Sequence, residues 1–544
     1  MAADRSSIRQ PQPEPQSSVQ PQPEPQSSVQ PQPEPQSSAQ PEPSAQPQPG
    51  RRPQLPSGSH LKGGELGEIR DRTLTLTVGP VAHGGHCVAR HEGRVIFVRH
   101  ALPGEVVQVR LTEYDDGASF WRADVTEVIQ PSTDRVKHFW AAADAPTAYA
   151  AGQLPVGGAE FGHITRAGQR RLKEAVLAEQ LHRLAEAGYL PGTGTGTGTG
   201  TGLGTGLPEV EDVDAAGTPD QAAGLAWRTR AGFAVTAAGR LGMHAHRSNQ
   251  VLPIEAMPLA APAINALRLW ETDLTGIARI EVAAPSTGSA PLVLLAPEPA
   301  LSAKAAGKVL KRVATQLGQG TAGLASAGRA AVSVAGWDPE SGLITPLRGR
   351  SWVSETSAGH EFRVSGAGFW QIHRLAPAVL TDAVLDFLQD GNHLAAGSVV
   401  ADLYAGAGLF TAPLADVVGP EGSVLSVEGS AGASRDARKN LHAAAQVTIQ
   451  GGRVERVLAG ARHRFDAVVL DPPRAGAGKP VIQRLVASSP RAIAYVSCDP
   501  ASFARDLGYF RTAGWKLERL RAFDLYPNTH HLETVALLTP GTHS

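Results

Sequence analysis

Cysteine occurs only twice in this sequence of 544 residues, at positions 87 and 498. Two cysteines can form neither a disulfide framework nor a zinc or iron–sulfur site held by thiolates alone. Cys498 follows the apolar run 492–496 and precedes Asp499 and Pro500, so it stands where a strand ends and a helix begins near Ala501. Because a helix N-terminus favours a thiolate, we predict nucleophilic chemistry at Cys498.

Acidic residues end the neighbouring apolar runs. Asp402 precedes Tyr404 and a turn with two glycines, and Glu428 ends the next run, 22 residues after Gly406. The glycine spacing is not Gly-x-Gly-x-x-Gly, which argues against a pyrophosphate cradle, whereas an acid at position 428 can accept both ribose hydroxyls of a nucleoside. An adenosine without a pyrophosphate satisfies both observations, and S-adenosylmethionine is such a cofactor.

Two further segments carry acids. Asp471-Pro-Pro-Arg474 closes a third run, and its prolines fix the backbone of Asp471 away from helix. Similar Asp/Asn-Pro-Pro-aromatic turns occur in methyltransferases that act on exocyclic amines, but Arg474 replaces the aromatic residue and favours a substrate with a carbonyl or phosphate. Near residue 530, a pair of histidines precedes Glu533, which begins the last apolar run. There Glu533 can serve as an acid or base that faces the other strand ends.

The elements that must position these residues form an α/β pattern from about Ser365 onward. Continuous apolar runs alternate with helix-like segments, at 399–403, 423–428, 465–471 and 492–498. Strands of this kind are buried on both faces and predict a doubly wound, mostly parallel sheet. Ligands of such sheets bind beyond the carboxyl ends of the strands, where the polar residues gather.

Shorter β-prone runs precede this region, at 74–78, 94–98, 105–111 and 122–128, with glycine-containing turns between them. They predict a small antiparallel barrel of about 65 residues. Gly84-Gly85, Val88-Ala-Arg90 and the segment 98–105 resemble the TRAM module, an OB-like barrel attached to RNA-modifying enzymes. We expect Cys87 and its neighbouring histidines to be solvated turn residues of this barrel rather than a metal site.

Two segments have low complexity. Residues 11–40 are three near-copies of a decapeptide rich in Pro, Gln and Ser, which predicts a disordered N-terminal tail. A helix is expected within 168–187. The almost pure Gly-Thr repeat 192–206 and the acidic stretch after it predict a flexible insertion over about 191–222.

These observations divide the chain into a tail (1–64), a barrel (65–131), a central α+β domain with the insertion (132–355) and a catalytic α/β domain (356–544). The charges nearly cancel, with 50 Lys and Arg against 51 Asp and Glu. This balance disfavours a protein that coats nucleic acid by bulk charge, so any nucleic-acid contact must come from local patches. We expect no membrane segment and a cytoplasmic location, because no unbroken apolar run approaches the length of a membrane helix.

Together the motifs resemble those of the RNA 5-methyluridine methyltransferases, which carry a Rossmann-like domain. The resemblance rests on four ordered segments, which are Gly368-Phe-Trp-Gln371, Asp471-Pro-Pro-Arg-Ala-Gly476, Ser497-Cys-Asp499 and Asp524-Leu-Tyr-Pro-Asn-Thr-His-His-Leu-Glu533. Tyr526 stands where the family usually has Phe, and Asp499 where it usually has Asn.

The resemblance implies residue roles. It makes Cys498 the nucleophile that adds to C6 of uracil, and Glu533 the base that removes the C5 proton after methyl transfer. It places Gln371, Tyr404, Glu428 and Asp471 at S-adenosylmethionine.

It also implies a target uridine that is extruded from its stack, and RNA as the partner of a monomeric enzyme. The attached barrel favours ribosomal over transfer RNA by analogy. Ala159 stands where some members have a cluster cysteine, so we expect no iron–sulfur cluster.

Two alternatives stay open at this point. The first is a methyltransferase for another atom or polymer, such as an amine or cytosine C5 in RNA or DNA, although Arg474 counts against an amine. The second is a catalytically silent RNA-binding protein that uses the barrel. A silent scaffold has no reason to retain Cys498 together with Glu533, which distinguishes the two classes.

Overall fold

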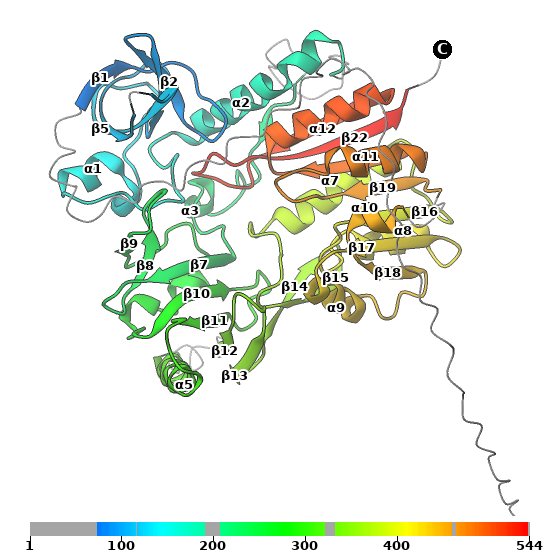
Figure 1. Cartoon of the computed structure of the whole chain (residues 1–544). Helices are drawn as coiled ribbons and strands as arrows, with labels where there is room; N and C mark the ends of the chain where they lie inside the picture. The colour runs from blue at the N-terminus through cyan, green and yellow to red at the C-terminus, as the bar shows by residue number, and fades with distance from the viewer. Residues whose placement is uncertain (1–72, 116, 191–206, 321–331, 460–463, 542–544) are drawn as a thin grey trace, which may run out of the picture. The chain divides into compact units, whose positions relative to one another are not determined.

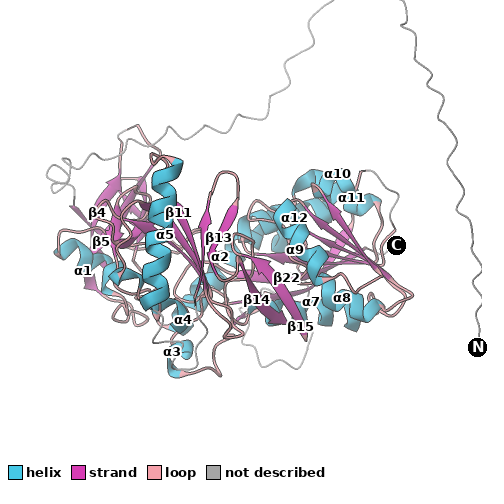
Figure 2. Ribbon diagram, turned by 90° about the horizontal axis from the view of Figure 1, so that it is seen from below, coloured by secondary structure: helices cyan, strands magenta, loops and turns pink. Residues whose placement is uncertain are grey.

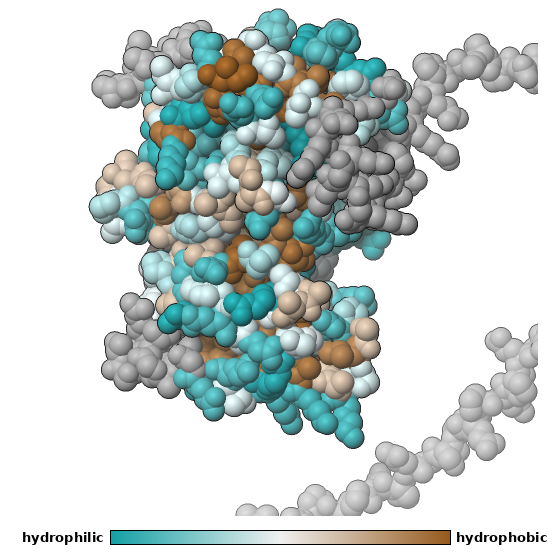
Figure 3. Space-filling model, turned by 90° about the vertical axis from the view of Figure 1, so that its left-hand side faces the viewer, coloured by the Kyte–Doolittle hydropathy of each residue, from teal (hydrophilic) through white to brown (hydrophobic). Residues whose placement is uncertain are grey.

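The computed structural model describes residues 73–115, 117–190, 207–320, 332–459 and 464–541 (Figure 1). The predicted disordered tail and the Gly-Thr repeat lie outside these ranges. Within them, the strands form a five-stranded, a seven-stranded, a two-stranded and an eight-stranded sheet. None of the helices in these ranges is long and apolar enough to cross a membrane. Hydrophilic residues cover much of the face in Figure 3, with smaller hydrophobic patches between them.

The five-stranded sheet is the predicted barrel. Its strands are β1 (Thr73–Thr77), β2 (Cys87–His91), β3 (Arg94–Arg99), β4 (Val106–Glu113) and β5 (Phe120–Gln130), in the order β1-β4-β5-β3-β2. The segment after β1 closes the sheet onto β2, since Gly79 N donates to Val88 O and Val88 N donates to Pro80 O, both at 2.8 Å. Only glycine fits at position 79, where a Cβ atom would lie 2.7 Å from Val88 O.

One expectation about the barrel was wrong. Cys87 is not a solvated turn residue, because it begins β2 and its side chain is fully buried in the barrel core. Alternation along β2 points Cys87 and Ala89 inward. The Cys87 thiol donates to Ala101 O at 3.4 Å.

The seven-stranded sheet forms the predicted α+β part, in the order β13-β12-β11-β10-β7-β8-β9. Its strands are β7 (Arg230–Val235), β8 (Leu241–His244), β9 (Val251–Pro253), β10 (Ile277–Ala283), β11 (Leu292–Pro297), β12 (Ser333–Trp337) and β13 (Ile344–Arg348). Neighbours are antiparallel except β11 and β12, which are parallel. Short helices α4 (Pro262–Asn265) and η3 (Leu269–Glu271) and the longer α5 (Ala303–Gly320) accompany the sheet.

A hairpin of β14 (Trp352–Ser357) and β15 (His360–Ser365) follows. The predicted domain boundary between residues 355 and 356 would cut through β14. The structure departs from this boundary, because the buried hairpin residues Val353 and Phe362 share one core with Leu380 of the next helix and with Leu294 of β11. The hairpin therefore fills the space between the two larger sheets.

The eight-stranded sheet carries the predicted doubly wound α/β fold, in the order β18-β17-β16-β19-β20-β22-β21-β6. Its strands are β16 (Val399–Leu403), β17 (Ser423–Glu428), β18 (Val447–Gly451), β19 (Ala467–Leu470), β20 (Ala492–Ser497), β21 (Trp515–Phe523), β22 (Glu533–Pro540) and β6 (Val210–Glu211). The first five strands in this order are parallel. β22 runs antiparallel between β20 and β21.

Helices cover both faces of this sheet (Figure 2). They are α7 (Ala376–Asp390), α8 (Thr411–Val418), α9 (Ala431–Asn440), α10 (Val454–Val457), α11 (Gly478–Ala487) and α12 (Pro500–Thr512). Successive residues of a strand pack into the cores on opposite faces of the sheet. Val400 packs with α7 and α8, whereas Ala401 packs with α11 and α12. The near-continuous apolar runs of the sequence follow from burial on both faces, and the predicted fold class is confirmed.

The predicted helix at 168–187 is α2 (Arg166–Glu186), which follows η2 (Ala141–Ala143) and α1 (Ala145–Ala150). Its apolar stripe serves two cores. Leu172 and Val176 pack against the barrel, and Leu177 and Leu181 pack against the α/β core. The helix also supplies Lys173 to a buried ion pair described below.

The predicted insertion extends too far. Residues 207–222 contain β6, which pairs with β21, and α3 (Pro219–Ala222). The acidic stretch is anchored by Asp214, which is 1% exposed and accepts hydrogen bonds from His373 (3.0 Å) and Arg374. Buried carboxylates need such partners, so this stretch belongs to the fold.

A buried ion network joins α2 to the segment between β21 and β22. Lys173 Nζ lies 2.5 Å from Asp524 Oδ1, and Arg166 Nη1 lies 2.6 Å from Asp524 Oδ2. Asp524 and Lys173 are almost completely buried. Burial opposes the charge of Asp524, but the two cations hold its pKa below the usual range.

This network predicts a strong effect on stability. Asp524→Asn leaves a buried ammonium without its counter-charge, so we expect the free energy of unfolding to fall by about 3–5 kcal/mol. The control Asp390→Asn removes an exposed ion pair with Arg519 (2.8 Å) and should cost less than about 1 kcal/mol. Urea unfolding followed by tryptophan fluorescence measures both variants, and equal midpoints would contradict the expectation.

Candidate active site

Strand pairing brings the predicted nucleophile and the predicted base to one edge of the sheet. In the antiparallel pair of β20 and β22, Ser497 lies opposite Thr534. The next residues toward the edge are Cys498 and Glu533, so the sheet places them side by side. Residues 35 positions apart in sequence meet because β22 is inserted beside β20.

Cys498 is half-buried, and its thiol differs from the expectation of a thiolate favoured by a helix N-terminus. Burial, with the nearby carboxyl groups of Glu533 and Asp471 adding to its effect and Arg474 opposing it, raises the pKa of Cys498 to about 12. The start of α12 is already capped, because the Asp499 side chain accepts a hydrogen bond from Ser502 N at 2.8 Å. The free protein therefore holds Cys498 as a thiol.

Glu533 is 2% exposed and begins β22. Its carboxylate oxygen Oε2 accepts a hydrogen bond from the Tyr526 hydroxyl at 3.1 Å. Burial and then the negative charge of Asp471 raise the pKa of Glu533 well above its usual range, while Tyr526 and Arg474 act in the opposite direction. A buried carboxylate of this kind binds a proton more strongly than an exposed one, which suits a general base.

Two more acids stand at neighbouring strand ends. Asp402 is in β16, and Asp471 follows β19, which pairs with β16. Burial raises the pKa of each carboxyl to about 7, with Glu428 adding to the shift of Asp402 and Asp402 to that of Asp471. Asp402 Oδ2 accepts from Thr411 Oγ1 at 2.5 Å, but its buried Oδ1 has no partner within the described residues. The edge thus gathers more negative charge than the protein compensates, and a cationic ligand suits it.

The loop from β16 to α8 meets the end of β17. Gly406 N donates to Glu428 Oε2 at 2.9 Å, and Ser430 N donates to Glu428 Oε1 at 2.5 Å. Tyr404 adopts φ 65° and Gly406 φ 58°, and a Cβ atom on Gly406 would meet nothing within 4 Å. Gly406 therefore borders open space at the carboxyl end of the sheet, where ligands of such sheets bind.

Gln371 comes from outside the sheet. It is 5% exposed and lies in the segment between β15 and α7. That segment is fixed to the seven-stranded sheet, since Arg230 Nη1 donates to Gly368 O at 2.7 Å and Thr229 N donates to Ile372 O at 2.8 Å. No described hydrogen bond joins the Gln371 side chain to the other predicted cofactor residues, so the structure does not itself assemble all four of them.

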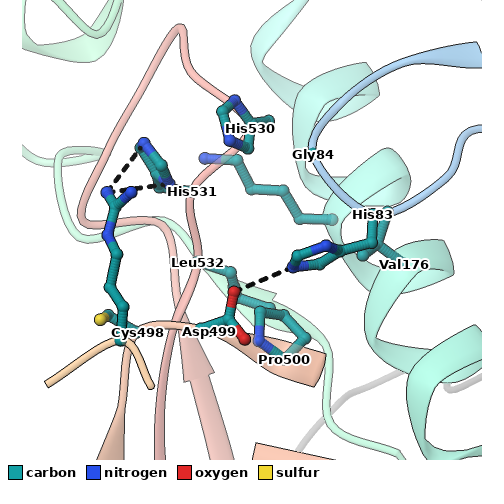
Figure 4. Close-up of a pocket in the computed structure, with 11 residues that line it drawn as sticks. His83, Gly84, Val176, Cys498, Asp499, Pro500, His530, His531 and Leu532 are labelled. Atoms are coloured by element: carbon teal, nitrogen blue, oxygen red, sulfur yellow. Dashed lines mark hydrogen bonds and ion pairs between the residues drawn. The ribbon is translucent and has the colours of Figure 1, made fainter. Parts of the chain in front are cut away.

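A cavity of about 120 Å³ opens beside Cys498 (Figure 4). Three parts of the chain line it, namely the barrel loop, α2 and the strand ends of the α/β sheet. The lining residues are His83, Gly84, Lys173, Val176, Arg474, Cys498, Asp499, Pro500, His530, His531 and Leu532. At the exposed side of this cavity, the Arg474 guanidinium lies 3.1 Å from His531 Nε2.

The barrel reaches this cavity through an ion pair. His83 Nε2 lies 2.9 Å from Asp499 Oδ2, which Figure 4 shows as a dashed line. The hydrogen bond to Asp499 raises the pKa of His83. Burial opposes ionisation of the Asp499 carboxyl. The hydrogen bonds from His83 and from Ser502 nevertheless lower the pKa of Asp499 to about 2. The residue after the nucleophile therefore both caps α12 and contacts the barrel.

Sequence reasoning missed two contacts in this site, which are the Tyr526–Glu533 hydrogen bond and the His83–Asp499 pair. The available signal was departure from the family pattern, because Tyr526 adds a hydroxyl to the usual Phe and Asp499 a charge to the usual Asn. Neither departure reveals its partner, since His83 lies 416 residues from Asp499.

Comparison with known proteins adds independent findings. A family model described as tRNA (uracil-5-)-methyltransferase matches residues 380–540, and a TRAM domain model matches residues 70–120. An uncharacterized RNA methyltransferase of Streptomyces avermitilis is 43% identical over 473 residues, which cover 86% of this chain and 98% of the relative. One of Bifidobacterium longum is 33% identical, covering 84% of this chain and 94% of the relative.

A solved structure has a similar fold. The Pyrococcus abyssi tRNA (uracil-54, C5)-methyltransferase, in complex with S-adenosyl-L-homocysteine, superposes with a TM-score of 0.58 at 18% sequence identity. The match covers 85% of this chain and 99% of that chain. At this low sequence identity, the similarity shows a shared fold.

The environment of Cys498 predicts a slow thiol in the free protein. With a pKa of about 12, alkylation of Cys498 by iodoacetamide at pH 7.5 should be at least about a hundredfold slower than that of free cysteine, and should rise about tenfold per pH unit up to pH 10. The Cys87→Ala variant leaves Cys498 as the single thiol and makes the measurement unambiguous. A rate that levels off below pH 9 would show that the thiol is activated before substrate binds.

Proposed function

The chain belongs to the S-adenosylmethionine-dependent RNA (uracil-5-)methyltransferase family, as its motifs predicted, and on this premise we propose that it forms 5-methyluridine with Cys498 as nucleophile and Glu533 as base. One observation carries the proposal of these roles. The β20–β22 register sets a thiol and a buried carboxyl side by side, next to the cavity. An RNA-binding scaffold alone would not need this pair.

The residues present fit the cofactor. Asp402 and Asp471 provide uncompensated negative charge for a sulfonium, and the open space beside Gly406 and Glu428 suits an adenosine. We propose that Gln371, Tyr404, Glu428 and Asp471 hold S-adenosylmethionine, with Glu428 at the ribose hydroxyls. When bound, this cofactor supplies an electrophilic methyl group on its sulfonium.

The side chains of the site divide the chemistry between them. Cys498 gives its proton to a neighbouring carboxylate and adds to C6 of uracil, which makes C5 a nucleophile that can take the methyl group. Glu533 then removes the C5 proton, the C5–C6 double bond re-forms, and the sulfur of Cys498 leaves. The cavity beside Cys498 receives an extruded uridine, because C5 and C6 are inaccessible within a base stack.

The RNA substrate also contacts the barrel in this proposal. The barrel loop lines the cavity and is fixed to Asp499, so RNA bound there lies next to the reacting residues. We also propose that the enzyme acts as a monomer. We propose that the chain is divided into a barrel, a central part and a catalytic part. The hairpin β14–β15 is assigned to the catalytic part.

The covalent step has a direct test. RNA that contains 5-fluorouridine should trap the protein as a covalent adduct in the presence of S-adenosylmethionine, because fluorine at C5 cannot be removed as a proton. Cys498→Ala should abolish the adduct, whereas Cys87→Ala should leave its yield unchanged. Denaturing gel electrophoresis measures the yield. An undiminished yield in Cys498→Ala would refute the assignment of the nucleophile.

The base has a complementary signature. Glu533→Gln should still form the adduct with the fluorinated RNA, but with natural RNA it should stall as a covalent complex, since the carboxamide cannot accept the C5 proton. Turnover of Glu533→Gln should fall by about 10²–10⁴-fold. Release of tritium from RNA that contains [5-³H]uridine measures removal of the C5 proton. Tritium release at the rate of the unchanged protein would place the base elsewhere.

We further propose ribosomal rather than transfer RNA as the substrate, on the basis of the attached barrel. In cells that lack the gene, mapping of 5-methyluridine should show one position of ribosomal RNA without the mark, and transfer RNA unchanged. A plasmid copy should restore the mark, and a Cys498→Ala copy should not. Loss of the mark from transfer RNA alone would overturn the choice of substrate but not the chemistry.

A further inference from the structure

We propose that Tyr526 is a positioning residue of the reaction, whose hydroxyl holds the Glu533 carboxylate in one orientation and in the ionised form that can accept a proton. The inference rests on the proposed role of Glu533. It goes beyond the family pattern, because the position of Tyr526 usually carries Phe, which has no hydroxyl. The observation that carries it is the hydrogen bond from Tyr526 Oη to Glu533 Oε2 at 3.1 Å.

The backbone of Tyr526 is held from several directions. Its carbonyl oxygen accepts hydrogen bonds from Lys173 Nζ at 3.0 Å and from Thr529 Oγ1 at 2.8 Å. Lys173 is itself fixed by Asp524. The position of residue 526 is therefore set by contacts that a Phe side chain would leave unchanged.

The ring of Tyr526 is also confined. Trp227 meets it edge-on with ring centroids 6.1 Å apart, and His531 meets it edge-on at 5.7 Å. Two residues further along, Asn528 has φ 63° and exchanges hydrogen bonds of 2.8 Å with the Gln169 side chain. A ring held in this way points its hydroxyl in one direction, so the bond to Glu533 costs little further ordering.

Charged and titratable groups face Glu533 from each neighbouring element. Asp471 after β19 brings negative charge, and Cys498 after β20 brings a thiol. Arg474 brings a positive charge. Burial and Asp471 raise the pKa of Glu533, whereas Tyr526 and Arg474 lower it. Among the described residues, Tyr526 donates a side-chain hydrogen bond to Glu533, and a hydrogen bond to a charged acceptor is among the stronger ones.

Tyr526 remains a donor throughout. Burial, and then the neighbouring Glu533, raise the pKa of its phenol well above the usual range, so it keeps its proton at neutral pH. In the step concerned, the C5–H bond breaks, a Glu533 O–H bond forms, the electron pair restores the C5–C6 double bond, and the C6–S bond to Cys498 breaks. Tyr526 forms and breaks no covalent bond, and it acts through Glu533.

The experiment follows formation and decay of the covalent complex in single turnovers of Tyr526→Phe with natural RNA and S-adenosylmethionine, between pH 5.5 and 9. Without the hydroxyl, the acid limb of the decay rate should shift upward by about 1–2 pH units, since the neutral form of Glu533 becomes favoured. Formation of the complex should keep its rate. At pH 9 the decay rate should return to that of the unchanged protein.

The matched control is Tyr495→Phe. The Tyr495 hydroxyl also donates to a buried carboxylate, Asp506 Oδ2 at 2.8 Å, but lies within the core of β20 and α12. This variant loses the same kind of bond and should leave the pH profile of decay in place. Circular dichroism and thermal unfolding of both variants separate loss of fold from loss of function.

The outcomes are distinct. An acid limb that coincides with that of the unchanged protein overturns the proposal, as does a uniform loss of rate at every pH, which would indicate a merely structural role. A Glu533→Gln variant with normal tritium release would instead overturn the proposed function, whatever Tyr526→Phe shows. A shifted limb in Tyr526→Phe, with stalled Glu533→Gln and an unshifted Tyr495→Phe, supports the positioning role.

Discussion

The pairing of β22 with β20 is the interaction on which the candidate site depends. It places Glu533 beside Cys498 because an antiparallel strand begins where its neighbour ends. The start of β22 is set in turn by the preceding segment, which Asp524 ties to Lys173 of α2. Since α2 also packs against the barrel, one helix links the barrel to the position of the proposed base, Glu533.

The electrostatics of the site favour the protein with a cation bound over the free protein. Asp402, Asp471 and Glu533 gather at one edge, and each has a pKa above the usual range because burial and like charges disfavour ionisation. Burial, together with Glu533 and Asp471, holds Cys498 as a thiol. A cation bound at this edge relieves the repulsion and favours the thiolate, so in the proposed reaction binding of the cofactor also favours ionisation of Cys498.

The sequence predicted the parts of the site that depend on local pattern. Apolar runs that end in Asp471 or Cys498 indicate strand ends, and a parallel sheet brings those ends together. The helix after Cys498 was also predicted, but its N-terminus does not produce the expected thiolate, because the side chain of Asp499 occupies the helix start and burial raises the pKa of the thiol. The acids that raise the pKa of the thiol, Glu533 and Asp471, lie on elements that only the tertiary fold brings close to Cys498.

Other features depend on distant partners and leave little trace in the sequence. Residues 207–222 look like a solvated acidic linker, yet Asp214 is buried against His373, 159 residues away. Lys173 reads as a surface residue of an amphipathic helix, although its partner Asp524 lies 351 residues further on. Paired charges can be buried where single ones cannot, and composition does not reveal the pairing.

The order of strands in the α/β sheet has a consequence for biosynthesis. β22 lies between β20 and β21 but follows both in the chain, so a nascent chain emerging from the ribosome carries Cys498 before Glu533 exists. Until β22 is made, β20 exposes an unpaired edge and β21 has only the short β6 as a neighbour. Such edges are prone to associate with other chains. Translation must therefore pass residue 540 before the sheet is protected, and synthesis of β22 both closes the sheet and completes the proposed catalytic pair.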